Sequence, residues 1–238
     1  MKLFLPKQHG AWAMLTVPFL LGMAAGGFHW FQLPLFVGWI ALYLATYPLI
    51  LVVKKKKVRF HLTWFRRYFT VALIFALPVL IVEPTLFLIA LMMLPFFFIN
   101  LWFGKRNKDR SLWNDFAAIT AFGIGGLGSY YLGAGYIDEP AWNVFLLAVL
   151  FFYGSAFFVK TMIREKKNPA FRWISWAYHL IVVGLFLATG AWLVTLAFIP
   201  SLVRAIYLHG KQLKPMQIGI LEIGNSLFFL IIVSAGFI

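Results

Sequence analysis

Residues 31–57 read FQLPLFVGWIALYLATYPLILVVKKKK, an apolar run of 23 residues followed by four lysines. A helix needs about 20 mostly apolar residues to cross the hydrocarbon core of a bilayer. Lysines that directly follow such a run are typical of the cytoplasmic end of a membrane helix. This stretch therefore predicts a transmembrane helix over 31–53 and a basic loop that begins at Lys54.

The rest of the chain repeats this pattern. Its 238 residues are 63% hydrophobic and 12% charged, whereas an ordinary globular domain is about 25% charged. This composition excludes a soluble globular domain and a disordered chain, and the lack of cysteine excludes a disulfide scaffold. We therefore predict an all-α, polytopic transmembrane bundle that forms a single integral membrane domain over 1–238. Its nine predicted spans are 10–28, 31–53, 68–82, 85–104, 114–136, 141–159, 173–189, 191–208 and 216–238.

The 21 lysines and arginines, against seven aspartates and glutamates, follow these spans. They all lie at the N-terminus or near the connections after the second, fourth, sixth and eighth spans, and the other four connections have none. Basic loops mark the cytoplasmic side, so we predict a multi-pass cell-membrane protein with a cytoplasmic N-terminus and an extracytoplasmic C-terminus. The first span resembles a secretory signal, but eight further spans follow, and we expect it to be uncleaved. The partners expected from this pattern are the lipid bilayer and its anionic head groups, not nucleic acid.

Ionisable side chains inside a membrane span are costly unless they are paired or hydrated, so each is a candidate for a functional site. Glu222 and His179 each lie about seven residues inside a predicted span and are the candidate catalytic acid or base. Other polar residues sit near the inner ends of the spans, and we expect them to converge into one cationic pocket open to the cytoplasm. The candidate substrate-binding residues are His9, Asn100, Lys105, Arg106, Asn107, Arg110, Asn114, Asp115, Lys160, Arg164, Arg204 and Asn225.

Each candidate also has a purely structural interpretation. Glu222 and Arg204 can form an ion pair that locks the last two helices together, and the asparagines can form interhelical hydrogen bonds. The glycine-rich stretch 123–128, GIGGLG, formally matches a dinucleotide-binding pattern, but it lies inside a predicted span and favours close helix packing instead. No metal site is predicted, and the sequence identifies no cofactor.

Three stretches carry a resemblance to a known family: PKQHGAW at 6–12, RNKDRSLWND at 106–115 and ILEIGNS at 220–226. They resemble the YwiC-like family along essentially the whole chain, which implies a multi-pass membrane protein without a defined activity. The predicted helix arrangement is also similar to that of UbiA-type prenyltransferases. That similarity implies an isoprenoid diphosphate held by Mg²⁺ at two Asp-rich loops. Here the second–third loop has no acidic residue and the sixth–seventh has only Glu165.

Three functions remain open from the sequence. The first is a UbiA-like transferase or lipid-modifying enzyme that acts on an isoprenoid diphosphate or another anionic amphiphile. The second is a structural or accessory membrane protein, and the third is a transporter of a small organic anion. A cavity touching Glu222, Arg204, Lys160 and Asn114 would favour the enzyme. A filled bundle in which Glu222 pairs with Arg204 would remove the basis for it.

Overall fold

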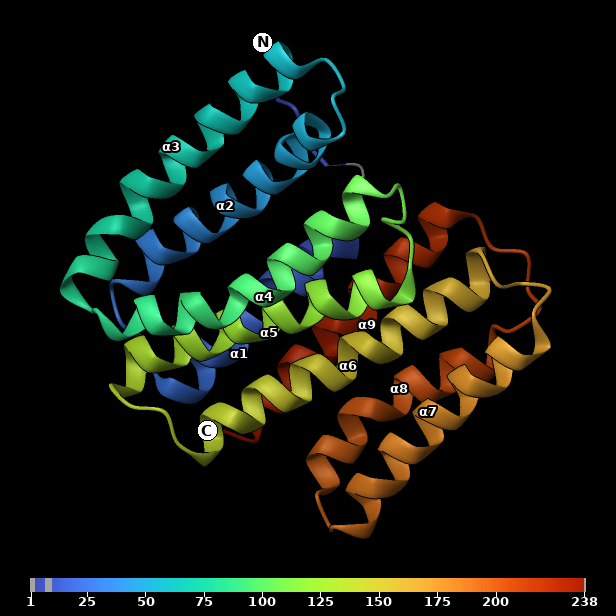
Figure 1. The fold of residues 1–238 in the computed structure, drawn as a ribbon. Coiled ribbons are helices and arrows are strands. Elements are labelled where there is room, and N and C mark those ends of the chain that lie inside the picture. The colour runs from blue at the N-terminus through green and yellow to red at the C-terminus, as the bar shows by residue number, and fades with distance from the viewer. Residues whose placement is uncertain (1–2, 7–9, 238) are drawn as a thin grey trace.

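The computed structural model describes residues 3–6 and 10–237, which form nine helices and no strand (Figure 1). The prediction of an all-α bundle is therefore confirmed for this part of the chain. Figure 1 shows the helices running back and forth, with the α2–α3 hairpin at one side of the bundle and the α7–α8 hairpin at the other. The helices are α1 Gly10–Gly26, α2 Gln32–Val53, α3 Val58–Val82, α4 Thr85–Lys105, α5 Leu112–Ala134, α6 Glu139–Ile163, α7 Pro169–Ala188, α8 Trp192–Tyr207 and α9 Pro215–Ala235.

Six of these helices are long and apolar enough to cross a membrane: α2, α3, α4, α6, α7 and α9. α1 and α8 are shorter apolar helices. α5 packs against α1, α4 and α6, and Trp113 is its only exposed residue. The chain is thus a multi-pass membrane protein.

Most helix boundaries lie close to the predicted spans, and one differs clearly. α3 begins at Val58, ten residues before the predicted span 68–82, and so includes part of the connection that begins at Lys54. The apolar run starts only after Arg66 and Arg67, but backbone hydrogen bonding continues through charged residues at a helix end. The predicted break near Gly190 is confirmed, because Gly190 adopts a positive φ of 73° between α7 and α8.

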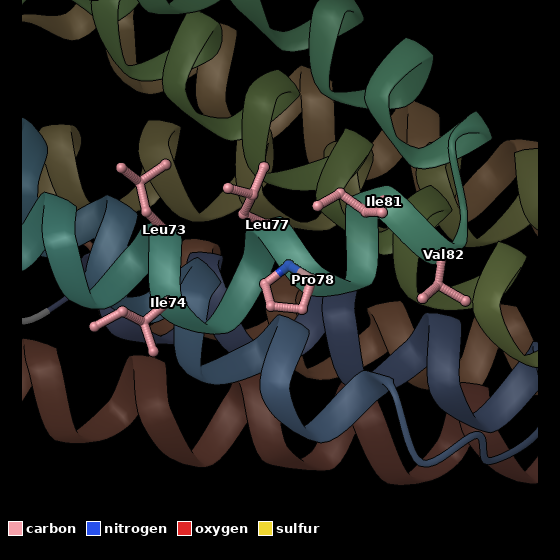
Figure 2. Close-up of a pocket in the computed structure, with 6 residues that line it drawn as sticks. All are labelled: Leu73, Ile74, Leu77, Pro78, Ile81 and Val82. Carbon is pink, nitrogen blue, oxygen red and sulfur yellow. The ribbon is translucent and has the colours of Figure 1, made fainter.

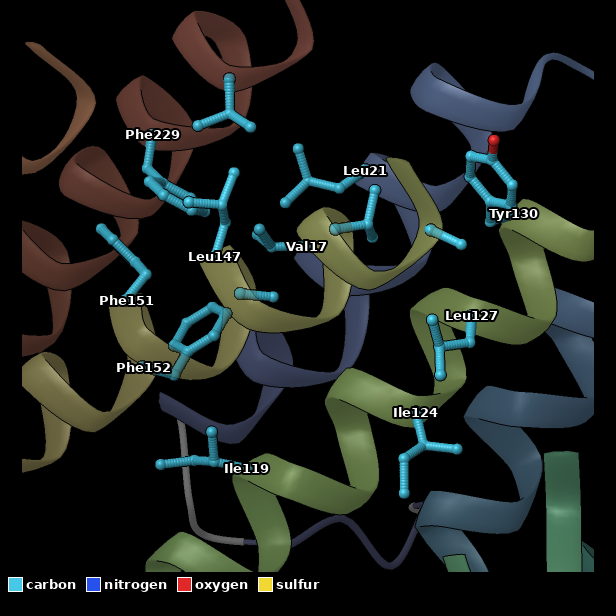
Figure 3. Packing of buried hydrophobic residues seen from close by; sticks show 14 of the residues in the cluster. Val17, Leu21, Ile119, Ile124, Leu127, Tyr130, Leu147, Phe151, Phe152 and Phe229 are labelled. Atoms are coloured by element: carbon cyan, nitrogen blue, oxygen red, sulfur yellow. The ribbon is translucent and has the colours of Figure 1, made fainter. Parts of the chain in front are cut away.

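The core of the bundle is built around a close contact between α1 and α5. A Cβ atom at Gly22 would lie 2.2 Å from the carbonyl oxygen of Gly126, and one at Gly126 would lie 2.7 Å from that of Pro18. Small residues allow such backbone contact between membrane helices. The packing predicted for 123–128 is therefore confirmed at Gly126. The apolar core continues into α6 and α9, where the rings of Phe151 and Phe229 stack at 4.0 Å (Figure 3).

The four loops that carry most of the lysines and arginines lie at one end of the bundle (Figure 1). We call it the basic end; its loops are residues 54–57, 106–111, 164–168 and 208–214. The connections at the opposite end, near residues 29, 83, 137 and 190, contain no lysine or arginine. The fold thus gathers the cationic side chains of helices that are far apart in the sequence.

Candidate functional site

Two groups of polar side chains lie toward the basic end, on different sides of α6. Ser155 of α6 contacts α8, whereas Lys160 of α6 contacts α5. Five residues along an α-helix correspond to a rotation of about 140°, so these two side chains point in different directions. The structure therefore places the predicted site residues in two groups. The buried polar cluster, between α6, α7, α8 and α9, consists of Ser155, His179, Ser201, Arg204, Glu222 and Asn225. The basic rim, where the α4–α5 loop meets the end of α6, consists of Lys105, Arg106, Arg110, Lys160 and Arg164.

An ion pair between Arg204 and Glu222 forms the centre of the buried polar cluster. Their side chains are only 8% and 10% exposed. The Arg204 guanidinium also donates a hydrogen bond to Oγ of Ser155 at 3.1 Å and lies over the ring of Phe158, 4.7 Å from its centroid. A charge inside a membrane protein persists where it is paired. These contacts join α6, α8 and α9 around one neutral pair, as the structural interpretation of Glu222 and Arg204 anticipated.

His179 lies beside this pair and has one free ring nitrogen. Its Nδ1 lies 2.7 Å from the carbonyl oxygen of Ser175, and a carbonyl only accepts hydrogen bonds. Nδ1 must therefore carry the proton, which leaves Nε2 of the neutral ring as an acceptor. Nε2 is buried and has no hydrogen-bond partner among the described residues. It faces Gly154, where a Cβ atom would lie 3.0 Å from it, so this glycine makes room for the imidazole.

Asn225 extends the cluster along α9. Its Nδ2 donates to Oγ of Ser201 at 2.9 Å, a bond that joins α9 to α8. Its Oδ1 and the hydroxyl of the adjacent Ser226 are buried and have no partner within the described part of the chain. Buried polar atoms are usually hydrogen-bonded, so the cluster can accept further polar contacts, for example from water.

Lys160 anchors the basic rim. It lies in the last turn of α6, is 6% exposed, and pairs with Asp115 at 2.9 Å. Its Nζ also donates to the carbonyl oxygen of Arg110 at 2.6 Å, and Arg164 donates to the same oxygen at 3.3 Å. Two cations thus fix the end of the α4–α5 loop against α6. Because Lys160 and Asp115 neutralise each other, neither supplies free charge to a ligand.

The α4–α5 loop is fixed from its other side by a second ion pair. Nζ of Lys54 lies 2.6 Å from the Asp109 carboxylate, and Asn114 donates to the carbonyl oxygen of Asp109 at 2.9 Å. Asn107 turns the chain with a positive φ of 56°, a conformation that asparagine tolerates better than most residues. The loop is therefore held at both ends, and its cationic side chains project from a fixed backbone.

The remaining cations of the basic rim are exposed. Within the described ranges, no ion pair involves Lys105, Arg106, Arg110 or Arg164. The guanidinium of Arg106 lies over the ring of Trp102, 4.2 Å from its centroid. This part of the rim carries positive charge that no described carboxylate neutralises.

Five predicted residues belong to neither group. Asn107, Asn114 and Asp115 lie in or beside the α4–α5 loop and take part in holding it, as described above. The other two are Asn100 and His9. Asn100 of α4 donates to the carbonyl oxygen of Phe96 in its own helix at 2.8 Å. His9 lies outside the described residues. Among the residues that the structure describes, no group of three or more histidine, aspartate or glutamate side chains lies close enough to hold a metal ion.

Two hollows in the described part of the chain touch neither Glu222 nor His179. One lies at the basic end between the α6–α7 and α8–α9 loops. The other is an apolar groove along the exposed face of α3, which suits contact with lipid chains. Figure 2 shows its lining residues, Leu73, Ile74, Leu77, Pro78, Ile81 and Val82.

Several partners in these groups were not predicted from the sequence. Ser155 and Ser201 are buried and hydrogen-bond to predicted residues, and Lys54 holds the loop through Asp109. Ser201 precedes Arg204 by three residues and therefore shares its helix face, a spacing that is visible in the sequence. The contact of Ser155 with Arg204 depends on which helices are neighbours, and no spacing within one helix reveals that.

Comparison with known proteins places the chain in a family. Residues 5–130 match the family described as YwiC-like protein. The "Uncharacterized protein YwiC" of Bacillus subtilis (strain 168) is 46% identical over 97% of this chain and 96% of its own length. An "Uncharacterized protein" of Haemophilus influenzae (strain ATCC 51907 / DSM 11121 / KW20 / Rd) is 39% identical over 99% of both chains. No solved structure matches the chain. With this similarity over nearly its full length, the chain belongs to the YwiC-like family.

Proposed function

We propose that this protein binds the anionic head group of a membrane amphiphile at its basic rim. One observation carries the proposal: Lys160 and Arg164 fix the backbone of Arg110, while Arg106, Arg110 and Arg164 are exposed and form no ion pair with a described carboxylate. The one carboxylate on which Arg164 acts electrostatically, that of Asp115, is already paired with Lys160. Guanidinium groups bind phosphate and carboxylate with two parallel hydrogen bonds. A fixed backbone lowers the entropy cost of binding, because the loop is ordered before the ligand arrives.

The apolar surface below the rim favours an amphiphile over a small soluble anion. Phe98, Ile99 and Trp102 of α4 are exposed and lead along the helix toward Arg106. Phe98 and Trp102 lie one helical turn apart, and Arg106 follows after another turn, so the three share one face. An isoprenoid diphosphate or another anionic amphiphile would place its chain along this apolar face and its head group at the rim. On the positive-inside rule, the basic end faces the cytoplasm.

The proposal does not include a transfer reaction. Glu222, the candidate acid or base, is paired with Arg204 inside the bundle. The basic rim and the buried polar cluster contact different faces of α6. A transferase would need the head group and the acid or base in one site, and the two hollows described above bring neither Glu222 nor His179 to the rim.

The test is titration of the purified protein in a neutral detergent with farnesyl diphosphate, with and without Mg²⁺, followed by thermal unfolding. We expect a saturable rise in Tm. In the double variant Arg106→Gln/Arg110→Gln the apparent affinity should fall at least about tenfold, since each guanidinium hydrogen bond to an anion contributes about 1.5–3 kcal/mol. The matched control, Arg59→Gln/Arg66→Gln, removes two exposed arginines of α3 and should bind like the wild type. A protein whose Tm does not respond, or a control that weakens equally, contradicts the proposal.

A further inference from the structure

A second polar feature lies at the basic end, away from the basic rim. A hollow of about 180 Å³ separates the α6–α7 loop from the α8–α9 loop. A water molecule occupies about 30 Å³ of liquid volume, so the hollow has room for several waters or one small anion. The polar side chains that line it are Thr161, Lys166, His209, Lys211 and Gln212, with no carboxylate among them.

His209 provides a polar atom without a partner. Its Nδ1 is buried and has no hydrogen-bond partner within the described ranges. The ring is held edge-on against Trp176 at 5.5 Å, and Trp176 is itself fixed by a hydrogen bond to the carbonyl oxygen of Ala205 at 2.9 Å. Because buried polar atoms are rarely left unpaired, a ligand or water that bonds Nδ1 would complete the site.

The charges around the hollow are positive. Lys166 and Lys211 line it from the two facing loops, and Nζ of Lys211 lies 3.4 Å from the ring centroid of Tyr207. Arg172 of α7 is close enough to act on His209 electrostatically. The neighbouring carboxylate of Glu165 accepts a hydrogen bond from Asn168 at 2.9 Å and does not line the hollow. An oxyanion is therefore the ligand whose charge this hollow complements.

From this geometry we propose that the hollow between the α6–α7 and α8–α9 loops binds a phosphate-type oxyanion, with Lys166 and Lys211 as its cationic walls and His209 as a hydrogen-bonding partner. The oxyanion is either free phosphate or the phosphate of a lipid head group. This site goes beyond the proposed amphiphile site, because its lining residues are not those of the basic rim.

The experiment uses the full chain in neutral detergent with two probes, inorganic phosphate and short-chain phosphatidic acid, at constant ionic strength. Thermal unfolding gives the apparent affinity for each. We expect saturable stabilisation by at least one probe, and a loss of at least about tenfold in affinity for Lys166→Gln/Lys211→Gln, since each charged hydrogen bond contributes about 1.5–3 kcal/mol. The control Lys167→Gln/Lys214→Gln removes two exposed lysines from the same two loops. Neither lysine lines the hollow, so this variant should bind like the wild type.

The outcomes separate the possible sources of the oxyanion. Binding of inorganic phosphate that depends on Lys166 and Lys211 supports a site for the free ion. A response to phosphatidic acid alone, with the same dependence, supports a lipid head group. No saturable response to either probe, or an equal loss in the control variant, overturns the site. Arg106→Gln/Arg110→Gln, which tests the basic rim, should leave unchanged the binding of inorganic phosphate that depends on Lys166 and Lys211. The two proposals can therefore fail separately.

Discussion

At the scale of single residues, the Arg204–Glu222 pair makes the sharpest prediction. Glu222→Gln leaves a buried guanidinium without its partner, which costs about 3–5 kcal/mol of stability. The double variant Arg204→Met/Glu222→Leu removes both charges and should recover most of this loss, because well-packed apolar residues often replace a buried ion pair without cost. Thermal unfolding in detergent would measure both. Equal destabilisation by the single and double variants would show that Arg204 has a role apart from this pair.

His209 makes a prediction about pH. Burial, and then the positive charge of Arg172, lowers the pKa of its imidazole below the usual 6.5. The charged and aromatic side chains that act on this ring or line the same hollow are Arg172, Trp176, Lys166 and Lys211. The ring is therefore mostly neutral at pH 7, and a bound dianion would favour its protonated form.

Affinity for sulfate, which keeps its charge, should consequently rise as the pH falls from about 8 to about 5. Because the pKa of His209 is lower in the folded protein, this histidine takes up a proton at a higher pH in the unfolded chain than in the folded one. Without an anion, His209 therefore contributes less stability as the pH drops below 6.5. His209→Gln should make sulfate affinity nearly independent of pH. A dependence that persists in His209→Gln would assign it to another group.

At the scale of helices, the contact between α1 and α5 can be tested by comparing one crowded glycine with two uncrowded ones. Gly22→Ala places a Cβ atom 2.2 Å from the Gly126 carbonyl, so the two helices must move apart and the protein should lose about 1–3 kcal/mol. Gly219 and Gly224 of α9 have no atom within 4 Å of an added Cβ. Alanine at either should be neutral or stabilise the helix by up to about 1 kcal/mol. Thermal unfolding compares the three variants, and a harmless Gly22→Ala would contradict the tight packing.

The helices themselves could be predicted because apolar runs and basic loops mark where a chain crosses a membrane. The start of α3 could not, because the prediction required apolar side chains whereas the helix continues through Arg59, Arg66 and Arg67. The ion-pair interpretation of Glu222 and Arg204 was available from the sequence, since α8 and α9 are consecutive. The separation of Lys160 from Arg204 was not, because depth along a span does not reveal which face of α6 meets which neighbour.

At the scale of the whole molecule, the arrangement of helices places paired charges inside the bundle and exposed cations at one end. Ion pairs inside the bundle, such as Arg204–Glu222, join helices, whereas exposed cations gather at one end, where both proposed sites lie. The net charge of +14 is thus concentrated on one surface. A surface of one sign raises the local concentration of anions, so both proposed sites benefit from the loops around them.

This charge separation also predicts the orientation of the protein in the membrane. The chain has no cysteine, so the wild type is a ready background for single-cysteine labelling. Because basic loops stay in the cytoplasm, a membrane-impermeant maleimide should label Tyr136→Cys and Trp192→Cys in intact cells. Both positions are well exposed, at 59% and 69%. Lys167→Cys, at the basic end, should react only after the membrane is opened. The reverse pattern would place the basic end outside, where neither proposed site could meet a cytoplasmic head group or phosphate.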